Sequence, residues 1–88
     1  MSGPSPTLQF PTEFPVKVMG LDSPDFHAAV ADIFTRHVAP FESLAVSRQA
    51  SRKGRFISVT VLFTAESRAQ LDALYADLSE HELVLMAL

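Results

Sequence analysis

Residues 14–38 read FPVKVMGLDSPDFHAAVADIFTRHV, and the rest of the fold is organised around this stretch. Its opening segment alternates in polarity, with Val16 and Val18 on one face and Lys17 and Met19 on the other. A period of two residues is typical of a strand with one buried face. The stretch therefore predicts a first strand that ends near its glycine.

The second part of the stretch predicts an amphipathic helix. Ser23 has the residue type of an N-cap, Pro24 suits the first helical position, and Asp25 lies where the helix dipole favours an acid. Apolar residues then recur at three- and four-residue spacing, which places them on one stripe. The stripe contains Phe26, Ala29, Val30, Ile33, Phe34 and His37.

The remaining sequence repeats this strand-and-helix pattern. Residues 43–50 and 55–65 alternate in polarity and flank the turn Ser51-Arg52-Lys53-Gly54, as expected for a hairpin. A capping-box pattern at residues 67–70 opens a second helix, and residues 82–88 predict a last strand.

The resulting order is βαββαβ. Two right-handed crossovers interleaved around a hairpin give a ferredoxin-like α+β fold. We expect a four-stranded antiparallel sheet of order 4-1-3-2 with two helices on one face. Residues 8–88 form this single domain, and residues 1–7, with Gly3, Pro4 and Pro6, are expected to be a disordered tail.

Composition narrows the class of protein. The 88-residue chain is 48% hydrophobic and has a net charge of −3, which gives no overall attraction to nucleic acid or anionic lipid. It has no cysteine, no signal-peptide pattern and no apolar run of the roughly 20 residues that span a bilayer. These features predict a cytoplasmic protein without disulfides.

Strand parity predicts that the uncovered sheet face is apolar. Such a surface usually marks an interface, so we expect a homodimer or a protein partner to bind there. Alternatively, the lead-in from Leu8 to Phe14 covers the face. The expected face consists of Lys17, Met19, Phe56, Ser58, Thr60, Leu62, Leu83 and Leu85.

The hairpin is basic, with Arg48, Arg52, Lys53 and Arg55 close together in an acidic chain. This patch can meet phosphate or an acidic partner, or it is a solvated turn that guards an edge strand. A nucleic-acid-binding module of this topology would stack bases on outward aromatic side chains. Only Phe56 offers such a ring.

The sequence predicts no enzyme, metal site or cofactor. His27 and His37 are about 15 Å apart along one helix, too far to share a metal ion. No nucleophile accompanies a base, and there is no glycine-rich phosphate loop. Acylphosphatases of this topology need an asparagine, which the chain lacks entirely.

The segments LQFPTEFPVKVMG, DFHAAVADIFTRHV and LVLMAL resemble the YbeD-like family of small bacterial proteins. The resemblance runs from about residue 8 to residue 88. It implies a ferredoxin-like, ACT-like fold, and the family's label of lipoic acid-binding regulatory protein implies a lipoate-like carboxylate ligand.

The loop after the first strand is similar to the ligand loop of ACT regulatory domains, which the resemblance places at Gly20, Asp22, Ser23 and Asp25. Asp25 stands where ACT domains have a glycine, and its carboxylate would repel an acidic ligand. We therefore expect a non-enzymatic regulatory or interaction domain that acts through its open sheet face. The alternative is a nucleic-acid-binding module that uses the basic hairpin.

Overall fold

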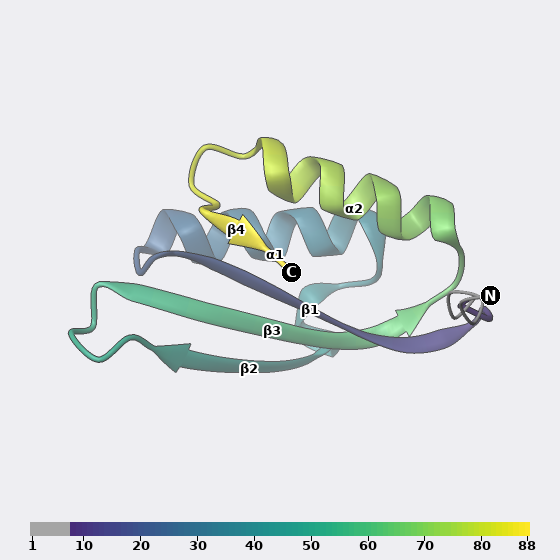
Figure 1. Ribbon diagram of the computed structural model, residues 1–88, viewed down its shortest axis with the longest axis horizontal. Coiled ribbons are helices and arrows are strands. Elements are labelled where there is room, and N and C mark those ends of the chain that lie inside the picture. Colours follow the sequence, from purple (N-terminus) through teal and green to yellow (C-terminus); the bar gives the residue numbers. More distant parts are fainter. Residues whose placement is uncertain (1–7) are drawn as a thin grey trace, which may run out of the picture.

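The computed structural model describes residues 8–88, so the tail expected over residues 1–7 lies outside the described residues. The elements are β1 (Thr12–Leu21), α1 (Pro24–His37), a 3₁₀ turn (Phe41–Ser43), β2 (Ala45–Ala50), β3 (Phe56–Ala65), α2 (Arg68–Glu80) and β4 (Met86–Ala87). The antiparallel sheet has the order β2-β3-β1-β4. Both helices lie on one side of it (Figure 1). The structure thus confirms the ferredoxin-like prediction and the strand order 4-1-3-2.

The start of α1 confirms the cap expected from the sequence. Ser23 Oγ accepts a hydrogen bond of 3.1 Å from the amide of Phe26, and Pro24 occupies the first turn. The helix ends at His37, and the amide of Val38 closes the last turn on the carbonyl of Phe34. Among the described residues, no helix has the length and apolar character needed to cross a membrane.

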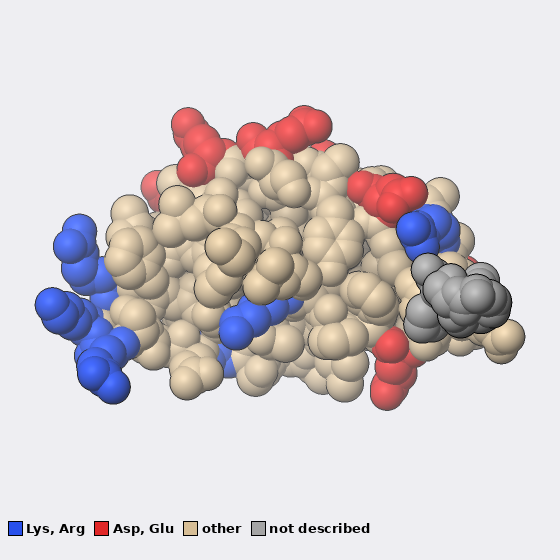
Figure 2. Space-filling view, in the orientation of Figure 1, with Lys and Arg blue, Asp and Glu red and all other residues tan. Residues whose placement is uncertain are grey.

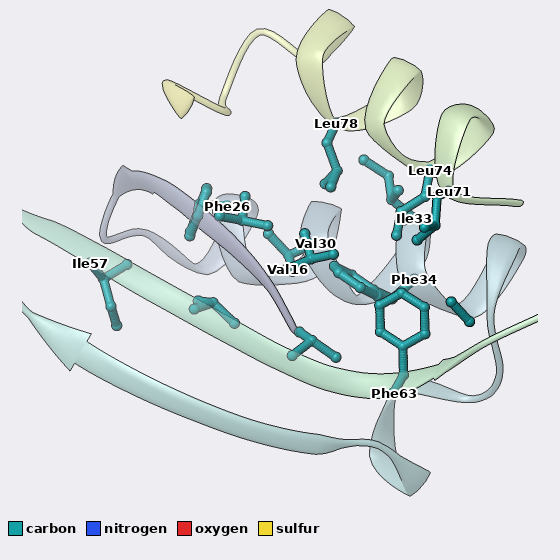
Figure 3. Close-up of a cluster of buried hydrophobic side chains, with 14 residues drawn as sticks. Val16, Phe26, Val30, Ile33, Phe34, Ile57, Phe63, Leu71, Leu74 and Leu78 are labelled. Atoms are coloured by element: carbon teal, nitrogen blue, oxygen red, sulfur yellow. The ribbon is translucent and has the colours of Figure 1, made fainter. Parts of the chain in front are cut away.

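The core lies between the helices and the inner face of the sheet. Phe34 from α1 meets Phe63 of β3 edge to face, with ring centroids 5.9 Å apart, and α2 contributes leucines from above (Figure 3). The predicted inward faces of the helices and of the two long strands supply the buried residues. These are Val16, Val18, Phe26, Val30, Ile33, Phe34, Ile57, Val59, Val61, Phe63, Ala65, Leu71, Leu74 and Leu78.

β1 begins at Thr12, before the expected start, and accommodates a proline. The amide and carbonyl of Lys17 both bond to Leu88, at 2.9 and 2.8 Å, on the side of β1 opposite β3. Since backbone groups alternate in direction along a strand, the nitrogen of Pro15 also points away from β3. β4 pairs only with Val18 and Met19, so Pro15 interrupts no ladder hydrogen bond.

The last strand is shorter than predicted. The expectation of a strand over residues 82–88 was wrong, because the chain first makes a turn. The amide of Val84 bonds to the carbonyl of His81, and the amide of Leu83 donates to Nδ1 of His81 at 3.1 Å. These local bonds hold the backbone out of the sheet, and only Met86–Ala87 is regular strand.

Candidate functional site: the open face of the sheet

The sheet face opposite the helices is the leading candidate site, and strand register defines it. Met19 of β1 lies opposite Ser58 on one side and Met86 on the other. Lys17 lies opposite Thr60 of β3. On the other side of β1, Lys17 lies opposite Leu88, with which it exchanges two backbone hydrogen bonds. In an antiparallel pair, opposite residues share a face. The row of side chains through Met19 and the row through Lys17 therefore form one surface across β4, β1 and β3.

Large apolar side chains on this surface are exposed. Phe56 is 41% exposed and Leu62 is 40% exposed, while Leu88 at the β4 end is 61% exposed. Charged side chains are rare on this face. Among the described residues, the alternation of side chains along the strands places only Glu13 and Lys17 there. Figure 2 shows a broad, largely uncharged surface, interrupted by basic side-chain atoms near its middle, between a basic left end and an acidic top.

Two of the expected face residues are placed differently. Leu83 is half-buried and packs against the core cluster, because the turn after α2 lies outside the strand. Leu85 is exposed and donates its amide to the carbonyl of Met19. Strand alternation assigns the open-face positions to Met86 and Leu88. The predicted parity of the last strand was therefore wrong by one residue.

The described part of the lead-in packs toward the core. Phe10 and Phe14 are half-buried against the core cluster. Phe14 also lies opposite the buried Phe63, which puts both rings on the helix side. These two phenylalanines thus do not cover the open face. They pack on the helix side of the sheet instead.

The ACT-like loop is built mainly for packing and capping. Gly20 is buried, and a Cβ atom there would lie 2.5 Å from Cε1 of Phe26 and 2.6 Å from the carbonyl oxygen of Leu83. Ser23 already caps α1, and Asp22 accepts a 2.7 Å hydrogen bond from Nε2 of His27. Asp25 is exposed in the first helical turn. The structure brings these residues together, but it commits two of them to local partners.

The basic patch divides between two places. Arg52, Lys53 and Arg55 occupy the β2–β3 turn, at the left end of the molecule in Figures 1 and 2. Together with Ser51 and Phe56 they line a shallow depression of about 280 Å³, and the guanidinium carbon of Arg55 lies 5.9 Å from the Phe56 ring centroid. Within residues 8–88, these turn cations form no ion pair.

Arg48 faces the opposite side of the sheet from the expected interface. It lies across from the buried Val59, and so belongs to the helix side. There it lines a groove of about 510 Å³ between α1 and β2, which the sequence reasoning missed. The small side chains Ala31 and Thr35 on α1, facing Val46 on β2, were the available signal. The other lining residues are Asp32, Phe41, Glu42 and Leu44.

The helix ends carry the main polar cluster. Nε2 of His37 donates a 2.6 Å hydrogen bond to Oδ2 of Asp77, and Arg36 reaches the same carboxylate at 3.4 Å. The hydrogen bond from His37 is the main cause that lowers the pKa of Asp77; the charges of His37 and Arg36 act in the same direction, and partial burial opposes them. Gln70 Nε2 adds a bond to the carbonyl of His37. This cluster joins α1 to α2.

The described residues contain no group of three or more histidine, aspartate or glutamate side chains that could hold a metal ion. The His27–Asp22 and His37–Asp77 pairs therefore remain pairs, each explained by contacts at a helix end.

Comparisons with known proteins agree on one family. A family model described as "Protein of unknown function (DUF493)" matches residues 5–88. A UPF0250 protein of Leptothrix cholodnii is 40% identical over 81 residues, covering 92% of this chain and 89% of the relative. A UPF0250 protein of Hahella chejuensis is 33% identical over 84 residues, covering 96% and 92%.

Among solved structures, the solution structure of HP0495 from H. pylori superposes with a TM-score of 0.75 and covers 99% of this chain and 91% of that one. At 12% sequence identity this likeness concerns the fold alone. The family model and the curated relatives decide the assignment: the chain belongs to the DUF493 (UPF0250) family of small bacterial proteins, the YbeD-like family that its motifs resemble.

Proposed function

We propose that this protein is a non-enzymatic regulatory domain that binds a protein partner through the open face of its sheet. The observation that carries the proposal is the exposure of Phe56, Leu62, Met86 and Leu88 on one side of the molecule. Exposed apolar surface of this kind is costly in water and usually marks an interaction site. The family description and the curated relatives are consistent with a domain of unknown function.

The chemistry of the face suits a partner with an apolar, weakly charged surface. Interface cores are depleted in charge and enriched in aromatic residues and methionine. Met19 and Met86 lie next to each other on this face, and Phe56 lies at the hairpin end. Lys17 is the single cation in the middle of the face, so an acidic group on the partner would set the orientation.

The test compares immobilised variants of the chain in a lysate of the source bacterium. Leu62→Glu and Leu88→Glu place charges on the open face, and Ala28→Glu is the matched control because Ala28 is exposed on α1, on the other side of the sheet. We expect a protein that wild type and Ala28→Glu retain and that both face variants lose. Equal retention by all four, or retention of no protein by wild type, would overturn the proposal.

A second candidate is the binding of a lipoate-like carboxylate, and the depression around Phe56 favours it. An apolar ring next to Arg52, Lys53 and Arg55 combines a contact for an acyl chain with cations for its carboxylate. Titration with octanoate, followed by NMR, should shift the amides of residues 51–56 in wild type and not in Phe56→Ala. Shifts that are identical in both proteins would exclude this site.

A further inference from the structure

The two edges of the sheet are protected very differently. On the β4 side, the edge strand is only Met86–Ala87, and Pro15 removes an amide from the exposed part of β1. Short edge strands and prolines are common devices against pairing with another chain. On the other side, β2 runs from Ala45 to Ala50 in unbroken register with β3 and contains neither proline nor bulge.

The outer backbone groups of β2 can be assigned. The amide of Ser51 donates to the carbonyl of Phe56, so the backbone groups of Ser51 point toward β3. Because direction alternates, Gln49 and Ser47 also point toward β3, whereas Val46 and Arg48 present their amides and carbonyls outward. Within residues 8–88, no strand pairs with this outer edge.

We propose that a second copy of this chain pairs with this edge, β2 against β2 and antiparallel, about a two-fold axis at Ser47. In this register Val46 lies opposite Arg48 of the second copy, and the two residues exchange both backbone hydrogen bonds. A two-fold contact of this kind is self-complementary by symmetry. The sheets of the two copies would join with all helices on one side.

Charge and backbone bonding together favour this register. Of the two adjacent registers that keep outward groups paired, one places Arg48 opposite Arg48, and like charges directly opposite each other destabilise a strand pair. The other places Arg48 opposite Leu44, whose amide already bonds to the carbonyl of Phe41. In the proposed register Arg48 faces Val46 of the second copy on the helix side. On that side, the Arg48 side chain of one copy reaches the mouth of the second copy's α1–β2 groove, which Asp32 and Glu42 line.

The ends of β2 are complementary in the same arrangement. The antiparallel register brings Arg52, just after β2, beside Glu42 of the second copy, just before it. Both side chains are exposed, and neither forms an ion pair within the described residues. The basic turn of each copy thus meets the acidic start of the other strand. This contact is separate from the open face, so the inference does not depend on the proposed function.

The experiment is sedimentation equilibrium of the full chain and its charge variants at low salt. We expect wild type to dimerise and each of Glu42→Arg and Arg52→Glu to raise the dimer Kd by about tenfold, since exposed charge pairs are individually modest and each occurs twice in the dimer. The double variant Glu42→Arg/Arg52→Glu should restore the wild-type Kd. Lys53→Glu, a matched charge reversal in the same turn, should change it less.

Amide hydrogen exchange supplies a readout that needs no variant. The amides of Val46 and Arg48 should exchange more slowly as the protein concentration rises, because only the dimer protects the outer edge. A protein that stays monomeric at about millimolar concentration, a weak-dimer regime, would overturn the proposal. A dimer without protection of these two amides, or a double variant no better than the single variants, would overturn it equally.

Discussion

At the scale of the residue, Gly20 shows how a loop that resembles a ligand site can be explained by packing. Its missing Cβ leaves room for the Phe26 ring and the Leu83 carbonyl. We expect Gly20→Ala to lower the free energy of unfolding by about 1–3 kcal/mol, the usual cost of overpacking. Urea denaturation measures this change. Gly54→Asn is the control, because Gly54 has a φ of 73° and open space around it, and asparagine tolerates that conformation; equal losses would refute the packing explanation.

The carboxyl group of Asp77 makes the stability of the folded protein depend on pH. Its pKa is lowered in the folded protein, mainly by the hydrogen bond from His37. The carboxylate therefore stabilises the fold at pH values above its ordinary pKa, and this contribution is lost as the pH falls through the lowered pKa. We expect Asp77→Asn to lower the Tm at neutral pH and to match wild type in strong acid. A Tm difference that stays constant with pH would contradict this expectation.

At the scale of the element, helix starts could be predicted from sequence because caps are local. Ser23 and Ser67 each accept a hydrogen bond from the amide three residues on, as the cap patterns indicated. In a capping box, the side chain three residues after the cap also accepts a hydrogen bond from the amide of the cap residue. In α2 the Gln70 Oε1 atom instead accepts from the amide of Glu66, one residue before the cap. The same local reasoning failed at β4. There, a turn held by His81 competed with an apolar run that reads as strand.

The α1 cap gives a direct prediction. Ser23→Ala removes the acceptor for the Phe26 amide and should lower the free energy of unfolding by about 1 kcal/mol. Ser23→Asp should retain most of that stability, because aspartate also accepts at the cap and suits the helix dipole. Chemical denaturation of the three proteins decides the matter. If the alanine and aspartate variants were equally unstable, the cap would not be the cause.

At the scale of the whole molecule, the order of the expected elements was enough to predict the topology, and the apolar faces of the strands and helices were enough to predict the core. The residues of the open face were harder to predict, because the exposure of a side chain depends on where each strand begins and ends. Met86 and Leu88 reach the open face only through the register of β4 with β1. The α1–β2 groove likewise depends on how far a helix covers an edge strand, and the small side chains Ala31 and Thr35 are only an indirect signal of that coverage.

The two sides of the sheet should differ in how much a substitution by threonine changes the free energy of unfolding. Leu62→Thr alters an exposed position and should change the free energy of unfolding by less than about 1 kcal/mol. Val61→Thr, at the fully buried neighbouring position, places a hydroxyl in the core and should cost about 1–3 kcal/mol. Thermal or urea unfolding of both variants tests this contrast, which would be absent if the open face were packed within the monomer.

The pairing of β1 with β3 also has a consequence for how the chain folds. It joins Thr12 to Ala65 at one end and Leu21 to Phe56 at the other, across both β2 and α1, whereas β2 and β3 meet through a short turn. Since distant segments pay a larger loop-closure entropy, the hairpin should form early and β1 should dock late. In stopped-flow kinetics, Val16→Ala should then chiefly speed unfolding and Val46→Ala should chiefly slow folding. The reverse assignment would mean that the long-range pairing of β1 with β3, rather than the local hairpin, nucleates folding.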